Sequence, residues 1–197
     1  MRHKGKSAPE LGQLRIIGGS HRGRKLTFPA LDGVRPTPDR VRETLFNWLM
    51  PIFPGPRCLD VFCGSGALGL EALSRGAADV TFIDQSPVIA SHLKSQIQLL
   101  RADNASVVNA DALSWLRAAS PDKPWEVVFL DPPFRKEFLA PALQILAERQ
   151  LLAANAYVYI EAEVELNPLP LPPGWNISRH KTTGQVQYAL CQVRQPD

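Results

Sequence analysis

The sequence predicts an α/β fold with a mostly parallel sheet. Apolar stretches typical of buried strands alternate with helix-like stretches over most of the 197 residues. One of these strands, ending at Phe62, runs directly into a glycine turn and a helix. Thr183-Gly184 joins the last two strand-like stretches, which predicts an antiparallel hairpin near the end of the sequence. Alternation of this kind gives a sheet with helices on both faces.

Composition is that of an ordinary globular protein. Hydrophobic residues make up 45% of the chain and charged residues 21%, which suits one main domain with a sizeable core. No stretch has the length of a membrane span, and Met1 to Lys6 carry no apolar segment typical of a signal peptide. Three cysteines without a C-x-x-C pair predict neither a metal site nor a disulfide framework. We therefore expect a cytoplasmic monomer without a metal.

Positive charge is concentrated in the first part of the chain. Residues 1–42 hold ten Lys or Arg against three acids, whereas residues 43–197 hold twelve against sixteen. This asymmetry indicates a polyanionic partner that is contacted through the N-terminal part. Residues 1–13 are polar and lack hydrophobic periodicity, so we expect a flexible basic tail there, and a merely solvated tail is the alternative.

Residues 14–50 are expected to form a hairpin and a helix. Leu14 to Phe28 reads as two short strands joined by a glycine- and arginine-rich turn, from which Arg22, Arg24 and Lys25 would reach phosphates. Thr37 is the expected N-cap of the next helix, with Pro38 at its first position.

The helix that follows carries an apolar stripe at helical spacing, which predicts core contact. Arg40 and Arg42 lie off this stripe. They are therefore candidates for contacts with RNA or with a carboxylate of a cofactor, and surface charges are the alternative.

The stretch Leu59-Asp-Val-Phe-Cys-Gly-Ser-Gly66 predicts a nucleotide-type cofactor site. Gly64 and Gly66 flank Ser65 and allow backbone angles that a side chain would forbid, so a ligand can lie against the main chain. The free N–H groups of the helix starting at Ala67 point toward the same place.

The glycine pattern alone leaves two cofactors open. Gly64, Gly66 and Gly69 also match G-x-G-x-x-G, and Asp84 follows Gly64 by twenty positions, as in dinucleotide-binding folds. Asp60, however, lies inside the strand, where burial is costly unless a cationic ligand needs the acid. S-adenosylmethionine carries an amino group and a sulfonium that could be that partner.

The remaining segments continue the alternation after the glycine turn. Ser86 is the expected N-cap of one helix, and Asn167 to Gly174 reads as a rigid connector. The expected strands are Asp79–Asp84, Ala105–Asn109, Trp125–Leu130, Ala156–Glu161, Asn176–Lys181 and Gln185–Val193, and the expected helices are Pro87–Leu100, Ala112–Ala119 and Phe138–Leu151.

Acids stand at four successive strand ends, where open α/β sheets bind ligands. They are Asp60, Asp84, Asp111 and Asp131. Asp84 can accept hydrogen bonds from both ribose hydroxyls of an adenosyl group. Asp111, with the adjoining Ala112, can accept from the exocyclic amine. A single acid of this kind is more often a helix cap, but together they predict a slot for adenosine.

Asp131-Pro132-Pro133-Phe134 decides between the two cofactors. The prolines fix a stiff turn that holds the Asp131 carboxylate and the Pro132 carbonyl as acceptors for an exocyclic amine. Such acceptors offset the positive charge that develops on the nitrogen during attack, and Phe134 offers a face for base stacking. Hydride transfer has no use for this arrangement.

Four motifs of the chain resemble the RsmD family, the bacterial 16S rRNA guanine-N2 methyltransferases. They are Leu14-Arg-Ile-Ile-Gly-Gly, Arg22-Gly-Arg-Lys-Leu26, Arg35-Pro-Thr-Pro-Asp-Arg-Val-Arg-Glu-Thr-Leu-Phe-Asn-Trp-Leu49 and Leu59-Asp-Val-Phe-Cys-Gly-Ser-Gly-Ala-Leu-Gly-Leu-Glu71.

The resemblance implies a Rossmann-like class I methyltransferase fold with a mostly parallel seven-stranded sheet, an antiparallel C-terminal hairpin and a small N-terminal β-hairpin extension. Residues 51–197 would form the methyltransferase domain, and residues 14–50 would face RNA. S-adenosylmethionine would be the cofactor, and 16S rRNA in the small ribosomal subunit or its precursor the partner.

The expected site residues fall into three groups. Cofactor binding is assigned to Thr37, Asp60, Gly64, Ser65, Gly66, Asp84, Asp111 and Ala112; catalysis to Asp131, Pro132, Pro133 and Phe134; RNA binding to Arg22, Arg24, Lys25, Arg40 and Arg42.

Other functions stay open at this point. The same amino chemistry could act on adenine N6 in DNA or on a glutamine side chain of a protein. A nicotinamide oxidoreductase and a binding-only assembly factor are further alternatives. Cys63 beside the glycines would suit a covalent mechanism, but no matching base lies near it in the sequence.

Overall fold

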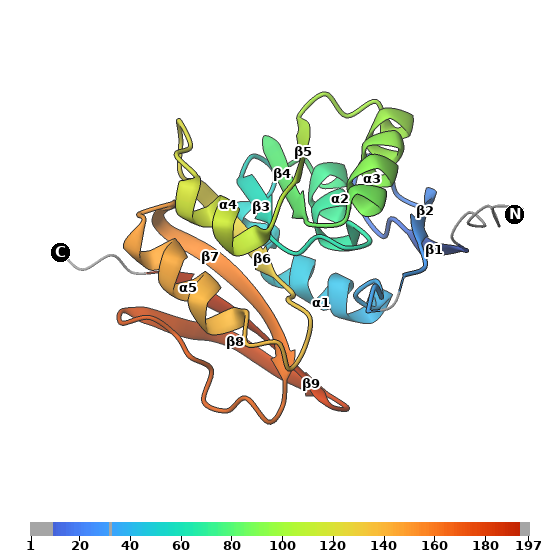
Figure 1. Cartoon of the computed structure of the whole chain (residues 1–197). Helices are drawn as coiled ribbons and strands as arrows, with labels where there is room; N and C mark the ends of the chain where they lie inside the picture. The colour runs from blue at the N-terminus through green and yellow to red at the C-terminus, as the bar shows by residue number, and fades with distance from the viewer. Residues whose placement is uncertain (1–9, 32, 194–197) are drawn as a thin grey trace, which may run out of the picture.

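The structure is a computed structural model that describes residues 10–31 and 33–193. A seven-stranded sheet forms its centre, in the order β5-β4-β3-β6-β7-β9-β8 (Figure 1). The first five strands are parallel, and β9 runs antiparallel to both β7 and β8, which confirms the predicted mixed sheet. The strands are β3 (Arg57–Asp60), β4 (Asp79–Asp84), β5 (Ala105–Asn109), β6 (Trp125–Leu130), β7 (Leu152–Glu163), β8 (Trp175–Thr183) and β9 (Val186–Val193).

Helices cover both faces of this sheet (Figure 1). Neighbouring residues of one strand point to opposite faces, so Phe129 of β6 belongs to one hydrophobic cluster and Val128 to the other. The first cluster packs α1, α2 and α3 with the N-terminal hairpin, and the second packs α4 and α5. The helices are α1 (Asp39–Trp48), the short 3-10 helix η1 (Met50–Ile52), α2 (Ala67–Ser74), α3 (Pro87–Leu100), α4 (Ala112–Ala118) and α5 (Leu139–Glu148).

β7 is longer than predicted and α5 is shorter. Gln150 has a positive φ of 52°, which stops the helix before Leu151. The pairing of β6 with β7 shifts register between Trp125 and Val127, and this irregularity lets β7 begin at Leu152 instead of Ala156.

The N-terminal hairpin is a separate two-stranded sheet that begins earlier than predicted. β1 (Leu11–Arg15) pairs antiparallel with β2 (Lys25–Pro29), starting from the pair Leu11 and Pro29. The expectation of a flexible tail is therefore wrong for Leu11 to Gln13, because ladder hydrogen bonds hold these residues. Residues 1–9 of that predicted tail lie outside the described residues.

The start of α1 also differs from the prediction. Pro38 is the N-cap, Asp39 is the first helical residue, and no side chain caps the helix. Thr37 is buried, and its hydroxyl hydrogen-bonds to Glu161 of β7. The predicted N-cap role of Thr37 is therefore wrong, because the side chain is drawn toward the sheet edge.

Candidate active site

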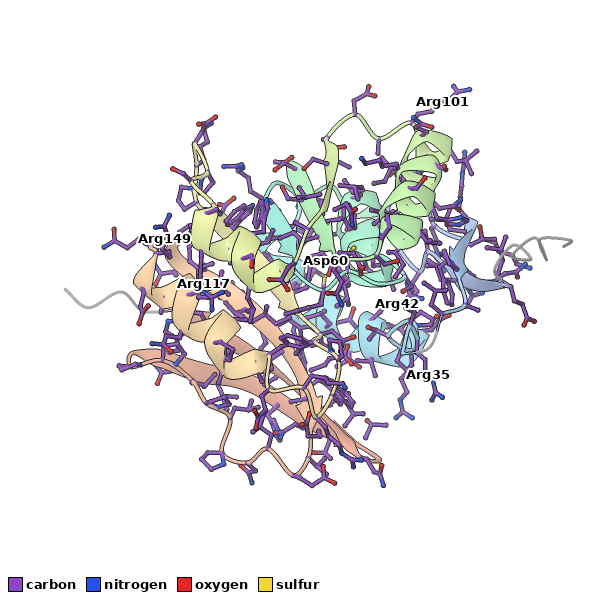
Figure 2. The ribbon with its side chains drawn as sticks, in the orientation of Figure 1. Arg35, Arg42, Asp60, Arg101, Arg117 and Arg149 are labelled. Atoms are coloured by element: carbon purple, nitrogen blue, oxygen red, sulfur yellow. The ribbon has the colours of Figure 1, made fainter. Side chains whose placement is uncertain are left out.

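The site lies where the strand order reverses. β4 lies on one side of β3 and β6 on the other, so the carboxyl ends of β3 and β6 flank the switch point at which such sheets bind ligands. Asp60 ends β3, near the middle of the molecule (Figure 2). The pair Leu130 and Ile160 joins β6 to β7, so the residues that follow them, Asp131 and Glu161, are brought side by side.

Two of the strand-end acids hold the glycine turn in place. The Gly69 N–H donates to Oδ2 of Asp60 at 2.9 Å, and the Gly64 N–H donates to Oδ2 of Asp84 at 3.0 Å. Asp84 accepts a second bond from the Ser86 N–H at 2.8 Å. The turn and the start of α2 are thus tied to the ends of β3 and β4.

The glycines of this turn are required by conformation and by space. Gly66 is the N-cap of α2 with φ 74°, and a Cβ there would lie 2.7 Å from Cδ1 of Leu93. A Cβ on Gly69 would lie 2.1 Å from the Phe82 ring, so this glycine lets α2 pack closely on β4. Ser65 is buried, and its hydroxyl accepts from the Ala67 N–H at 3.4 Å.

Asp111 acts as a helix cap. Its Oδ1 accepts from the Ser114 N–H at 2.9 Å, and hydrogen bonds from Ser114 lower the pKa of this exposed carboxyl. The adjoining Ala112 is buried at the start of α4. Oδ1 of Asp111 therefore caps the helix. The predicted contact of Asp111 with adenine stays a prediction, and it would use the other carboxyl oxygen.

Four carboxyl groups gather around the switch point. Burial raises the pKa of Asp60 to about 7, with Asp84 and Glu161 adding to the rise. Burial also raises the pKa of Asp131, and the nearby Glu161 and Asp60 raise it further. Glu161 and Asp84 have raised pKa values too, again chiefly because of burial. In the described part of the chain, no salt bridge reaches any of these carboxyls.

This cluster fits a cationic organic ligand. Mutual repulsion and burial raise the pKa values of these acids, and a bound positive charge would offset both effects. No group of three or more His, Cys, Asp or Glu side chains among the described residues is arranged to hold a metal ion. The residues present therefore suit a ligand with an ammonium and a sulfonium, as S-adenosylmethionine has.

Glu161 is the site residue that sequence reasoning missed. The sequence predicts it at the end of a strand, without a role of its own. It is 6% exposed, and its Oε1 accepts from the Tyr159 hydroxyl at 2.9 Å. The signal in the sequence is an acid in the apolar run Tyr157-Val-Tyr-Ile-Glu-Ala162, where burial of a charge needs a reason.

A cavity of about 290 Å³ opens beside Glu161, between the turn after β6 and the end of β7. Pro132 and Pro133 form part of its wall, and their predicted part in catalysis stays a prediction. Phe134 is 38% exposed and does not belong to this wall, whereas Phe138 does. The described wall consists of Pro132, Pro133, Arg135, Glu137, Phe138, Leu139, Ala140, Glu161, Ala162, Glu163, Leu166 and Pro170.

The predicted RNA-binding arginines divide into exposed and buried ones. Arg22, Arg24 and Lys25 are exposed on and beside the hairpin turn, and Arg40 is exposed on α1. Arg42 is only 1% exposed (Figure 2). An RNA contact by Arg42 is therefore wrong, because its guanidinium is enclosed by the protein.

Arg42 belongs to a buried ion network that anchors the hairpin. It donates to Asp39 at 2.6 Å, to Glu71 at 3.3 Å and to the carbonyls of Thr37 and Arg15. Glu71 of α2 is fully buried and also accepts from Arg75 and from the N–H groups of residues 17 and 18. The hairpin turn is thus fixed to α2, and the helical pattern of α1 gives no sign of this role.

The fold is also that of known methyltransferases. The structure of a Thermus thermophilus 16S rRNA N2 G1207 methyltransferase (RsmC) in complex with AdoMet and guanosine superposes with a TM-score of 0.70. It is 16% identical and covers 96% of this chain and 52% of that one, so the likeness shows the fold alone. The fold is therefore the Rossmann-like fold of class I methyltransferases.

Closer relatives identify the family. The family described as conserved hypothetical protein 95 matches residues 14–192. Ribosomal RNA small subunit methyltransferase D of Escherichia coli (strain K12) is 50% identical over 182 residues, covering 92% of this chain and 90% of the relative. The solved structure of yhhF from Escherichia coli superposes with a TM-score of 0.85 at 48% identity, covering 93% of this chain and 99% of that one. The chain belongs to this family, the RsmD family that its motifs resemble.

The sequence is expected to contain no membrane-spanning segment. Within residues 10–31 and 33–193, no helix has both the length and the apolar character that crossing a membrane requires.

Proposed function

We propose that this protein transfers a methyl group from S-adenosylmethionine to N2 of a guanine in 16S rRNA. The observation that carries the proposal is the carboxyl pair Asp131 and Glu161, which lies at neighbouring strand ends of a methyltransferase fold, with Glu161 in the wall of a cavity between the ends of β6 and β7. The name of the 50%-identical relative, which specifies small-subunit ribosomal RNA, supports the choice of substrate.

The cofactor would be held by the glycine turn and the acids around it. When bound, S-adenosylmethionine supplies an electrophilic methyl group on a positively charged sulfur. Asp60 would face the positive end of the ligand, and Asp84 would accept from the ribose hydroxyls. Gly64 and Gly66 would let the ligand approach the main chain. Asp111 and Ala112, at the start of α4, would border the adenine.

Asp131 would act on the acceptor amine. The amine of guanine is a weak nucleophile because its lone pair is delocalised into the ring. The Asp131 carboxylate and the Pro132 carbonyl would accept hydrogen bonds from the two amine N–H groups and stabilise the charge that develops on nitrogen. Holding the amine in line for attack would supply much of the rate, so little acid–base chemistry is needed from the protein.

The exposed cations of the hairpin would contact phosphates. Arg22 and Lys25 have no intramolecular ion pair among the described residues, and the anchored hairpin turn would present them as a rigid surface. Phosphate contacts orient an RNA without reading its sequence. Selection of the target base would then rest on the cavity.

Nucleoside mapping tests this function. Small subunits and free 16S rRNA from cells lacking the gene would be incubated with the protein and labelled S-adenosylmethionine, then digested to nucleosides for mass spectrometry. We expect N2-methylguanosine at one position. Label in N6-methyladenosine, in DNA or in a protein glutamine would instead establish one of the other acceptors. Asp131→Ala serves as the inactive control.

A further inference from the structure

We propose that Glu161 is a specificity-determining residue that recognises the N1–H of the target guanine. The inference rests on the proposed function and extends it by naming the group that would separate guanine from adenine. Asp131 would accept from the exocyclic amine, and Glu161 would accept from the ring N–H next to it.

The position of Glu161 fits contact with a base. The residue lies near the end of β7 and forms part of the wall of the 290 Å³ cavity, together with Pro132 from the turn after β6. Leu139 and Leu166 give this cavity apolar walls, and Phe138 adds an aromatic one. A planar base could bury its faces there while its polar edge meets the carboxyl pair.

The contacts of Glu161 hold its carboxyl group in place but leave some of its hydrogen-bond acceptor positions free. Tyr159 donates to Oε1 at 2.9 Å, and the Thr37 hydroxyl is a second donor. A carboxylate offers about four lone-pair positions, so about two are left for a ligand. Among the described residues, no basic group pairs with Glu161. Its carboxylate can therefore accept hydrogen bonds that the fold does not supply.

The chemistry of the pair matches one base edge. Guanine presents two adjacent donors, the ring N1–H and the 2-amine, whereas adenine has an acceptor at N1. Two neighbouring carboxylates can accept from both guanine donors. If adenine were bound, one carboxylate would face the lone pair of N1. That buried carboxylate would then lack a hydrogen-bond donor, which costs free energy.

The test uses 2-aminopurine, which keeps the 2-amine but has an unprotonated N1. Once the modified nucleotide is mapped, 16S rRNA carrying either guanine or 2-aminopurine at that position would be used as substrate. A site that hydrogen-bonds a substrate N–H discriminates against analogues lacking it by about 10⁴ to 10⁵ in kcat/KM. We expect wild-type protein to prefer guanine on that scale.

Glu161→Gln provides the decisive comparison. The glutamine amide can donate to the unprotonated N1, so the ratio of kcat/KM for guanine over 2-aminopurine should fall at least about tenfold, one favourable hydrogen bond being worth that much. Glu165→Gln is the matched control, since Glu165 is exposed beyond the end of β7, and it should leave the ratio unchanged.

Three outcomes are distinguishable. If Glu161→Gln lowers both rates equally and keeps the ratio, the residue is structural and the inference fails. If wild-type protein uses 2-aminopurine within tenfold of guanine, the inference fails even where the variant does not fold. If wild-type protein methylates no guanine in either RNA, the proposed function itself fails.

Discussion

Asp60 opposes folding at a position where we propose that it serves cofactor binding. Among the described residues, one hydrogen bond, from the Gly69 N–H, reaches a carboxyl that is 2% exposed. Burial raises its pKa from 3.8 to about 7, so the folded chain keeps a proton that the unfolded chain releases. The free energy of unfolding therefore falls as pH rises from about 4 to about 7 and is level above that, as far as Asp60 is concerned.

The first prediction is that Asp60→Asn stabilises the free protein at pH 8. The asparagine oxygen can still accept from Gly69, but no charge is buried. The free energy of unfolding should rise by at most about 4 kcal/mol at pH 8, and the difference between the two proteins should vanish near pH 4. Urea unfolding of both proteins at the two pH values measures it. Calorimetry should show weaker binding of S-adenosylmethionine, and equal stability at pH 8 would contradict the burial argument.

The second prediction separates the role of Asp131 from cofactor binding. Asp131→Ala should lower the single-turnover rate of methyl transfer by about 10² to 10³, as loss of one charge-stabilising group does. Its dissociation constant for S-adenosylmethionine should stay near that of the wild type. Asp84→Ala should do the reverse, since Asp84 holds Gly64 and faces the predicted ribose position. Equal loss of binding and rate in Asp131→Ala would remove its assignment as the amine acceptor.

At the scale of elements, α2 depends on its approach to β4. An alanine inside a helix normally stabilises it by about 1 kcal/mol relative to glycine. At Gly69 the sign should reverse, because the new Cβ would lie 2.1 Å from the ring of Phe82.

The third prediction is therefore that Gly69→Ala destabilises the protein by about 1 to 3 kcal/mol. Denaturant unfolding of the cofactor-free protein measures the change. Ser91→Ala, at an exposed position of α3, is the control and should be neutral or slightly stabilising. A stabilised Gly69→Ala would show that the helix can move away from the sheet without cost.

The fourth prediction concerns the ion network that joins α1, α2 and the hairpin. Arg42→Met would remove one of the two arginines that pair with the buried Glu71, together with the donor to two carbonyls, so the free energy of unfolding should fall by about 1 to 3 kcal/mol. Arg40→Met, two positions away and exposed, should change it by less than about 0.5 kcal/mol. If the two variants are equally stable, Arg42 does not anchor the hairpin.

Element types are predictable from sequence because they follow local patterns. The apolar stretch of β3, the glycines after it and the Ser86 cap of α3 are readable from neighbouring residues alone, and the structure has all three, although β3 ends at Asp60 and not at Phe62. The roles of Arg42 and Glu161 are not predictable in this way. Arg42 lies 29 positions from Glu71 in the sequence, and Glu161 lies on the strand next to the one that Asp131 follows, so only the tertiary fold reveals these two roles.

At the scale of the whole molecule, the N-terminal hairpin and the sheet share one core. Leu14 and Leu26 of the hairpin belong to the same hydrophobic cluster as Phe129 of β6. The predicted boundary at residue 50 is therefore not a break in packing. A rigid connection of this kind would fix the distance from the exposed cations of the hairpin to the cavity beside Asp131.

Position on the molecule should then decide which cations contribute to RNA binding. Arg22 and Lys25 lie exposed at the hairpin, which packs against α2 and α3. Arg179 and Lys181 are equally exposed but belong to β8, the opposite edge strand from β5 (Figure 1). Both pairs carry the same charge, so long-range attraction alone would treat them alike.

The fifth prediction compares charge reversal at these two places. In Arg22→Glu/Lys25→Glu, the slope of log affinity against log salt should flatten by about 0.7 to 0.9 for each phosphate that the hairpin no longer neutralises. Arg179→Glu/Lys181→Glu makes the same change in net charge and should leave the slope almost unaltered, because charges beyond a Debye length of about 10 Å at 0.1 M salt are screened. Binding of 16S rRNA at several salt concentrations distinguishes the two. Equal slopes in both variants would mean that RNA senses the overall charge of the protein and that the hairpin does not touch it.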